Sequence, residues 1–402
     1  MATPTLALIP TGYKAGKLYS VLPESGVGDF TVVRATEATR VNEEGLIETM
    51  GANVPRLDYS GGGCPVLLTE PQSTNYDFES TNFSTSFMSN SSGISSSVLT
   101  SNIAPDGSSN SVYKITKVTD NSDPYLGRSG VVFTSTSMVF SAWLWTDEDQ
   151  PKDVLLIVYR DGAQEVQTKN ITLTTTPTRY FIEASFTTTP SSISYRIDLN
   201  ELESNQYIYA WGKQLEAGSY ATSYIPTSGS AVTRNGDQVN GAGDAATFND
   251  SEGVLMAEVS ALANDGTDRY ITLGTTVNNV YIRYQTSTNS IRCNVTVNGS
   301  SQFIASTTLN DATVNTKLSI KYKLNDFSLW INGFLIKTDL SGLTPIGLSE
   351  LAFDDGGGGN DFYGKTKQIQ YFNTVLTDSE LETLTSWTSF IEMAQAQNYN
   401  II

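Results

Sequence analysis

The chain has 402 residues, of which 39% are hydrophobic and only 16% charged, and it carries a net charge of −18 with no histidine. This length predicts two or three domains. The acidic balance argues against binding to nucleic acid, which needs a basic patch or stripe. The absence of histidine excludes Ser-His-Asp and Cys-His catalysis and His-ligated metal sites.

The N-terminal segment and the cysteines indicate where the protein is made and whether it has a membrane partner. Residues 1–17 lack a basic stretch followed by an apolar one, and no run reaches the ~18 apolar residues of a membrane span. Cys64 and Cys293 lie far apart in the sequence, which favours two reduced thiols over a disulfide. We therefore expect a protein that is made in a cytoplasm and has no membrane partner.

Residues 1–75 consist of short strand-like pieces separated by turn formers. Residues 30–33 alternate between apolar and polar, and residues 39–41 and 46–48 flank a turn in a predicted hairpin. A glycine turn at 61–63 precedes an apolar run at 66–68. Because this segment has little periodic apolar content, we expect it to need a partner surface or sister chains in order to fold.

Two long motifs in this region resemble a module found at the front of many tailed-phage virion proteins. The strings are DFTVVRATEATRVNEEGLIETMGANVPRLDY at 29–59 and CPVLLTEPQSTN at 64–75. Ser73 departs from the pattern, which usually has a basic residue there. The matching positions are Arg34, Ala35, Ala38, Thr39, Gly45, Ala52, Asn53, Val54, Pro55, Arg56, Asp58, Tyr59, Glu70, Pro71 and Gln72.

Residues 76–235 carry strand-like runs broken by Ser, Thr, Pro and Gly, which is typical of an antiparallel sandwich. The ending WGKQLEAGSYATSYIPT at 211–227 resembles the last strand of the carbohydrate-binding-module-like jelly roll that follows the first module in those phage proteins. The small, polar and Gly-rich stretch at 228–245 predicts a linker. The expected strands are 112–115, 138–145, 154–159, 179–186, 192–199 and 206–211.

A second series of strands follows the predicted linker. Asn332-Gly333 is a hairpin turn signal, because both residues tolerate positive φ, and Thr377 with Glu380 forms a predicted capping box for a short helix. The end of the chain at 363–384 resembles the closing strand and helix of laminin-G or concanavalin A-like jelly rolls. The expected strands are 253–259, 269–273, 280–284, 290–297, 317–323, 327–331 and 365–372.

The sequence therefore predicts an all-β fold with three parts. These are a short N-terminal β attachment module at 1–75, a carbohydrate-binding-module-like jelly roll at 76–235 and a concanavalin A/laminin-G-like jelly roll at 236–402, both of the latter being antiparallel β-sandwiches.

A catalytic site is not expected. A glycosidase needs two carboxylates on one face of a strand, and the strands at 318–322 and 366–371 contain no such pair. Asp147, Glu148 and Asp149 are clustered, but they follow the end of a strand and are typical of a solvated loop. We therefore expect no enzyme and no cofactor.

The Gly-rich stretch at 354–363 is the best candidate for ligand binding. Asp354, Asp355, Asn360 and Asp361 offer oxygen atoms to a glycan or to Ca²⁺, and Tyr363 adds an aromatic ring. The alternative is an ordinary acidic surface loop between two strands.

Three tryptophans are further candidates. Trp143 and Trp145 are two residues apart and share one face of their strand, so they form a stacking platform if that face points outward and core if it points inward. Trp330 lies beside the predicted hairpin turn and could contact a ligand, whereas Trp211 is expected to pack within its sandwich.

The resemblance implies a virion protein of a tailed phage, a projecting head or tail fibre or decoration subunit on the exterior of the particle. Its first module would dock to other virion proteins, trimers are usual for such fibres, and the sandwiches would bind glycans of the host surface or its surroundings. The alternatives are a purely structural decoration protein without glycan binding and a capsule depolymerase.

Overall fold

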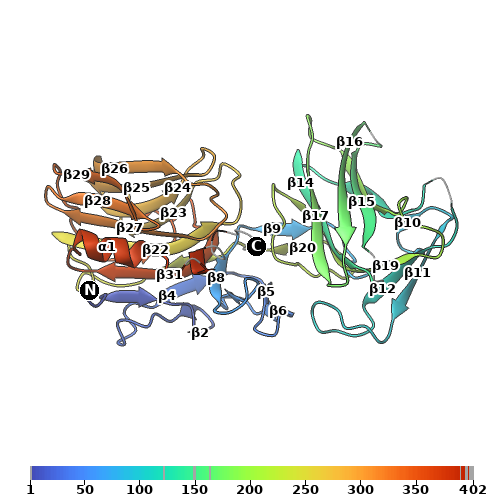
Figure 1. Cartoon of the computed structure of the whole chain (residues 1–402), viewed down its shortest axis with the longest axis horizontal. Helices are drawn as coiled ribbons and strands as arrows, with labels where there is room; N and C mark the ends of the chain where they lie inside the picture. The colour runs from blue at the N-terminus through green and yellow to red at the C-terminus, as the bar shows by residue number, and fades with distance from the viewer. Residues whose placement is uncertain are drawn as a thin grey trace. The chain divides into compact units, whose positions relative to one another are not determined.

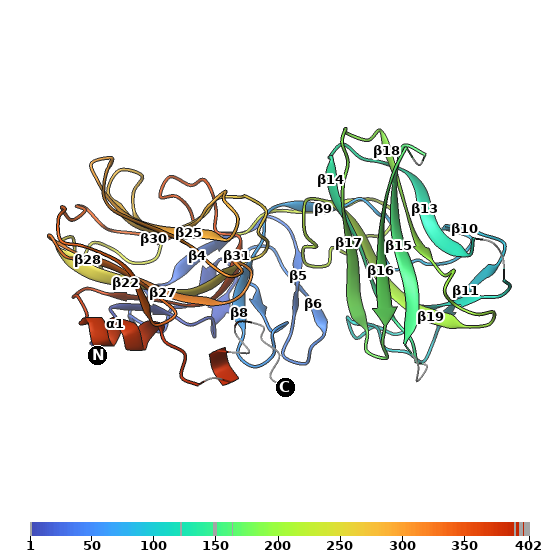
Figure 2. The same cartoon turned by 45° about the horizontal axis from the view of Figure 1, so that its top comes forward.

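The computed structural model describes residues 2–120, 123–147, 151–162, 164–389, 391–393 and 397. The chain divides into two compact units, each with its own core (Figures 1 and 2). Unit 1 comprises residues 1–37, 50–71 and 235–402, and unit 2 comprises residues 38–49 and 72–234.

Unit 1 is a sandwich of two antiparallel sheets. Its larger sheet has eight strands among the described residues. In spatial order they are β29 (Phe334–Asp339), β28 (Phe327–Ile331), β27 (Thr316–Lys323), β22 (Glu252–Ala261), β31 (Gly364–Phe372), β8 (Val66–Thr69) and β7 (Leu57–Asp58), with β1 (Leu6–Leu8) also paired to β31.

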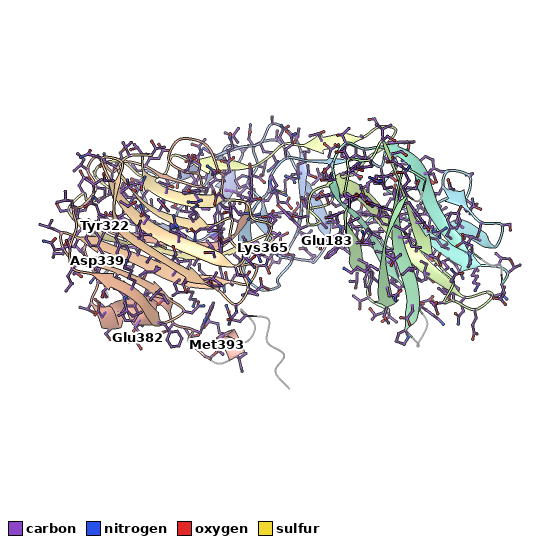
Figure 3. The ribbon with its side chains drawn as sticks, turned by 90° about the horizontal axis from the view of Figure 1, so that it is seen from above. Glu183, Tyr322, Asp339, Lys365, Glu382 and Met393 are labelled. Carbon is purple, nitrogen blue, oxygen red and sulfur yellow. The ribbon has the colours of Figure 1, made fainter. Side chains whose placement is uncertain are left out.

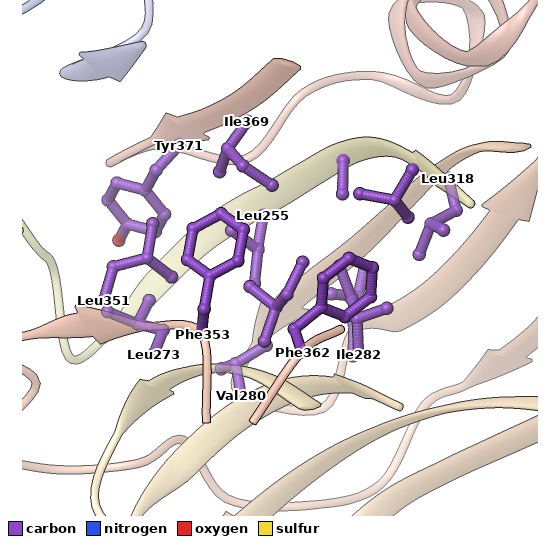
Figure 4. Packing of buried hydrophobic residues seen from close by; sticks show 14 of the residues in the cluster. Leu255, Leu273, Val280, Ile282, Leu318, Leu351, Phe353, Phe362, Ile369 and Tyr371 are labelled. Atoms are coloured by element: carbon purple, nitrogen blue, oxygen red, sulfur yellow. The ribbon is translucent and has the colours of Figure 1, made fainter. Parts of the chain in front are cut away.

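The second sheet of unit 1 packs against the first through alternate side chains. Leu255 of the larger sheet and Ile282 of the smaller one meet in the core, together with Phe353 and Phe362 (Figure 4). Successive side chains of a strand point to opposite faces of its sheet, so one face of each sheet lies in the core and the other points outward. The strands of the second sheet are β26 (Ser300–Thr308), β25 (Ser290–Val297), β24 (Asn279–Tyr284), β23 (Arg269–Gly274) and β30 (Leu351–Ala352).

The N-terminal segments do not form a separate unit, which differs from the three-part division expected from the sequence. β1 and β8 pair with β31 near the end of the chain, so the partner surface that residues 1–75 need comes from this same chain. The predicted linker at 228–245 is also paired. A four-stranded sheet contains β2 (Tyr13–Lys14), β3 (Lys17–Leu18), β4 (Phe30–Val33) and β21 (Gln238–Asn240).

A buried ionic network fastens these segments together. Asp237 accepts a hydrogen bond from Arg34 at 2.8 Å and pairs with Arg56, which also donates to Glu70 at 2.5 Å. All four side chains are nearly inaccessible to solvent. Burial by itself would lower the pKa of Arg56, but Asp237 and Glu70 outweigh it and raise that pKa above its ordinary value. Arg34, Arg56 and Glu70 belong to the N-terminal motifs, and the network explains why these positions carry charge.

Unit 2 is a sandwich of two five-stranded sheets among the described residues. Phe140 and Tyr195 stack in its core with ring centroids 4.1 Å apart. One sheet contains β10 (Ser89–Asn90), β13 (Tyr125–Val132), β18 (Ser192–Asp198), β15 (Lys152–Arg160) and β16 (Glu165–Leu173). The other contains β11 (Ile94–Leu99), β12 (Val112–Lys117), β19 (Tyr207–Ala217), β14 (Ser137–Trp145) and β17 (Thr178–Ser185).

Two short two-stranded sheets complete the β structure. The hairpin predicted at 39–48 is confirmed as β5 (Ala38–Val41) and β6 (Ile47–Met50), and β20 (Val232–Arg234) pairs with β9 (Ser73–Asn75).

The remaining local predictions are confirmed. Asn332 and Gly333 have φ of 50° and 84° in the turn between β28 and β29, and Thr377 forms the capping box with Glu380 at the start of α1 (Asp378–Thr385). The all-β fold is confirmed, with antiparallel sheets in both units. No helix in the described part of the chain is long and apolar enough to cross a membrane.

Candidate functional site

The outer face of the smaller sheet in unit 1 gathers aromatic and polar side chains. Core residues such as Ile271 and Ile282 alternate with outward ones along each strand. Strand pairing then aligns the outward residues in a row across the sheet, which runs Ala352, Thr272, Tyr281, Asn294 and Ile304. We call this surface the tyrosine face and define it by Tyr270, Thr272, Asn279, Tyr281, Arg283, Arg292, Asn294, Thr296 and Ile304.

Two tyrosines form the aromatic part of the tyrosine face. The ring centroids of Tyr270 and Tyr281 are 5.2 Å apart, and both side chains are half-buried. Their hydroxyl groups make no hydrogen bond within the described residues. Burial is the main cause that raises the pKa of Tyr270, so its hydroxyl remains protonated at neutral pH. Each tyrosine therefore offers an apolar ring and an uncommitted hydroxyl.

Arg283 stiffens this aromatic pair. Its guanidinium lies 5.0 Å from the Tyr270 ring centroid and forms two hydrogen bonds to Asp268, at 2.9 and 2.7 Å. Burial acts to lower the pKa of Arg283, but the bonds to Asp268 outweigh it and raise that pKa. A bidentate arginine held in this way keeps the Tyr270 ring in place.

Asn294 lies in the floor of the tyrosine face between Tyr281 and Ile304. It is 1% exposed, and its Nδ2 donates to Thr296 at 2.7 Å. Its Oδ1 has no hydrogen-bond partner, and the same is true of Oδ1 of the neighbouring Asn279. Buried carbonyl oxygens are nearly always paired, so these two atoms mark positions for hydroxyl donors supplied by water or by a ligand.

Arg292 supplies the positive charge at the other side of the face. Its Nε donates to Ser306 at 3.1 Å, and no carboxylate pairs with it within the residues that the structure describes.

The Gly-rich loop predicted as a ligand site lies along the edge of the tyrosine face. The backbone amide of Tyr270 donates to Asn360 O at 3.1 Å. A Cβ on Gly356 would lie 3.0 Å from Gly274 O, so only glycine allows this approach. Asp355 is close enough to act on the pKa of Tyr270. The loop therefore borders the candidate site, although its carboxylates are already committed.

The carboxylates of this loop hold the loop itself. Asp354 accepts from the amide of Gly356 at 2.7 Å, and Asp355 accepts from the amides of Gly357 and Gly359 and from Asn360. No group of three or more metal-ligating side chains occurs in the described part of the chain. Asp354 and Asp355 therefore point to amide groups within the loop and do not converge on a site for the Ca²⁺ considered from the sequence.

Asp361 differs from its neighbours in the loop. Its Oδ2 accepts from the Tyr363 hydroxyl at 2.9 Å, while its buried Oδ1 has no partner. Burial raises the pKa of Asp361 and the charges of Asp354 and Asp355 raise it further, against the effect of the Tyr363 bond.

The three candidate tryptophans lie away from the tyrosine face. Trp330 is 7% exposed and packs with Phe372, Leu376 and Leu381 beneath α1 on the opposite sheet. Burial against the helix leaves it no open ring face for a ligand.

Trp143 and Trp145 belong to unit 2 and share a face of β14, as predicted from their spacing. That face points away from the main core, yet it is covered by a second apolar cluster. Trp143 meets Trp211 at 5.2 Å and Trp145 meets Tyr209 at 5.5 Å between ring centroids. Both tryptophans therefore pack in a second apolar cluster on the outward face of the sheet. The sequence allowed an exposed platform or the main core, and the structure shows neither.

Comparison with known proteins gives no family for this chain. No family model and no curated protein matches it. Among solved structures, the CBM40 domain of the Ruminococcus gnavus IT-sialidase is 14% identical over 34% of this chain and 84% of its own, with a TM-score of 0.30. The CBM22-1 xylan-binding domain of Paenibacillus barcinonensis Xyn10C is 14% identical over 37% and 94%, with a TM-score of 0.28.

Mouse laminin alpha1 domains LG4-5 are 7% identical over 63% of this chain and 86% of their own, with a TM-score of 0.24. These similarities are too remote to carry an argument about a ligand.

Proposed function

We propose that this chain is a non-enzymatic glycan-binding protein whose saccharide site is the tyrosine face. The observation that supports it is the combination of two adjacent tyrosine rings, tilted by 59° to each other, with a floor of buried amide oxygens that lack a hydrogen bond among the described residues. A sugar ring presents an apolar C–H face to aromatic rings and a rim of hydroxyls to polar atoms. We expect a sugar hydroxyl to donate to Asn294 Oδ1 the hydrogen bond that this atom lacks among the described residues.

We further propose that the chain is a subunit of a tailed-phage virion, exposed on the exterior of the particle as a head or tail fibre or decoration protein. This part rests on the resemblance of the motifs at 29–75 and 211–227. Docking to other virion proteins through the N-terminal segments and synthesis in the host cytoplasm belong to the same proposal. Immunogold imaging of intact particles tests it, and label confined to the host lysate would contradict it.

A glycan array probed with the full chain tests the binding proposal. Tyr281→Ala removes one ring of the pair and should weaken the strongest signals by about tenfold, which corresponds to ~1.4 kcal/mol. Tyr180→Ala, a half-buried tyrosine of unit 2, is the matched control and should leave the signals unchanged. Signals that survive Tyr281→Ala would contradict the site. A full chain that binds no glycan would favour a purely structural decoration protein.

A further inference from the structure

The free edge of the larger sheet in unit 1 is lined with exposed apolar side chains. β29 is the last strand of that sheet, and the turn before β28 and the loop after β29 extend its apolar surface. The side chains are between 37% and 76% exposed. We call them the edge patch, and they are Leu324, Phe334, Leu335, Ile336, Leu340, Leu343 and Ile346.

The backbone of β29 is equally open. Five of its six residues are exposed and the sixth, Asp339 (labelled in Figure 3), is half-buried. No strand in the described part of the chain pairs with its outer side. An edge strand of this kind presents a row of unpaired N–H and C=O groups, which is a template for another strand.

The lysine on this edge strand does not protect it against pairing with another strand. Soluble proteins commonly place a lysine on an exposed edge to keep other strands away. Lys337 stands in the middle of β29, but its Nζ donates to Ile304 O on β26 at 2.8 Å and lies 5.6 Å from the Phe303 ring centroid. Its charge is therefore directed toward the neighbouring sheet edge of the same chain.

The size of the edge patch matches an interface between proteins. With exposed fractions of 37–76%, the seven side chains leave about 700 Å² of apolar surface in water, where monomers usually show largest patches of roughly 300–600 Å². A stable interface buries about 800 Å² on each partner. An edge patch on this scale is expected to be covered in the assembled protein.

We propose that a second copy of this chain covers the edge patch by antiparallel pairing of β29 with its own copy. This inference does not depend on the proposed glycan site. A two-fold axis at Thr338 places Lys337 opposite Asp339 of the partner subunit and Ile336 opposite Leu340 of the partner subunit, because antiparallel partners count in opposite directions. The Ile336–Leu340 contact then occurs twice, once from each subunit, while Lys337 keeps its bond to Ile304 O of its own chain.

Sedimentation velocity of the full chain measures this association. The unmodified chain should sediment with twice its monomer mass of 43.6 kDa. The double substitution Ile336→Lys with Leu340→Lys adds charge at exposed positions and should weaken association by at least about 100-fold without changing the melting temperature. Val132→Lys is the matched control, since Val132 is 74% exposed in unit 2, and it should leave the dimer intact. A monomeric unmodified chain, or a dimer unaffected by the double substitution, would overturn the proposal.

Cross-linking tests the two-fold register. Cys64 is exposed and Cys293 is buried with a raised pKa, so Cys64→Ser leaves a background without an accessible thiol. In that background Thr338→Cys should give a covalent dimer with a short bismaleimide, whereas Thr176→Cys, at an exposed position in unit 2, should not. A trimer that the lysine substitutions dissociate would support the edge patch as the interface but overturn the two-fold pairing.

Discussion

Asn294 combines burial with an unsatisfied acceptor beside two half-buried tyrosines. An unpaired buried carbonyl costs about 1–3 kcal/mol of folding free energy. Ser319 and Ser328 show the same feature on the larger sheet, but they are not flanked by aromatic rings with free hydroxyls. The tyrosine face is where an unpaired atom, an aromatic platform and an uncommitted cation coincide.

Replacing Asn294 by leucine, which has a similar size, separates stability from binding. The substitution loses the bond to Thr296 but also removes the unpaired oxygen, so we expect the free energy of unfolding to change by less than about 1 kcal/mol. Glycan binding should fall by about tenfold or more. Urea denaturation and calorimetric titration with a glycan from the array measure the two quantities. Ser319→Ala is the control, and equal binding by both variants would contradict a role for Asn294.

We expect the free energy of unfolding to depend on pH through Asp361. Burial, Asp354 and Asp355 together raise its pKa above the ordinary value of 3.8, although Tyr363 opposes this. A raised pKa in the folded state means that Asp361 contributes most below about pH 4 and that this contribution is lost as the pH rises through the raised pKa. Asp361→Asn should therefore raise the free energy of unfolding at pH 7 by about 1 kcal/mol and have little effect at pH 3.

Urea denaturation of both proteins between pH 3 and pH 7 measures this difference. Glu201→Gln, at an exposed position of unit 2, serves as a control outside the loop. A difference between wild type and Asp361→Asn that does not grow with pH would show that the pKa of Asp361 is not raised in the folded protein.

Local signals predicted most single elements well. The Asn332-Gly333 turn, the Thr377 cap and the alternation of residues 30–33 are each set by neighbouring residues, so sequence alone was sufficient. The pairing of β8 with β31 joins residues about 300 positions apart and that of β1 with β31 residues about 360 apart, and no local pattern carries that information. The stretch at 228–245 resembled a linker for the same reason, because its two short strands bond to distant partners.

The ionic network around Asp237 joins segments that are distant in the sequence, so we expect its loss to lower the free energy of unfolding. Asp237→Ala leaves the buried guanidinium groups of Arg34 and Arg56 without this carboxylate. Breaking a buried pair in this way costs about 3–5 kcal/mol, and we expect that loss in the free energy of unfolding of unit 1. Asp120→Ala removes a 75% exposed partner of Lys117 and should cost less than about 0.5 kcal/mol. Similar effects from both substitutions would contradict the account of the network.

At the scale of the whole molecule, the sequence predicted two sandwiches but not the place of the candidate site. The tryptophans and the Gly-rich acidic loop were candidate ligand sites because tryptophan is rare in the chain and the loop has an unusual composition. The tyrosine face draws Tyr270, Tyr281 and Asn294 from three strands, and each looks like an ordinary outward residue until the register aligns them. The outward positions of the predicted strands 269–273, 280–284 and 290–297 already contained this signal.

A crystal structure of the full chain with the strongest glycan from the array shows whether a saccharide binds on the tyrosine face. We expect electron density for a sugar ring against Tyr270 or Tyr281, with a hydroxyl within hydrogen-bond distance of Asn294 Oδ1. Density for the glycan elsewhere on the chain, with the tyrosine face empty, would contradict it.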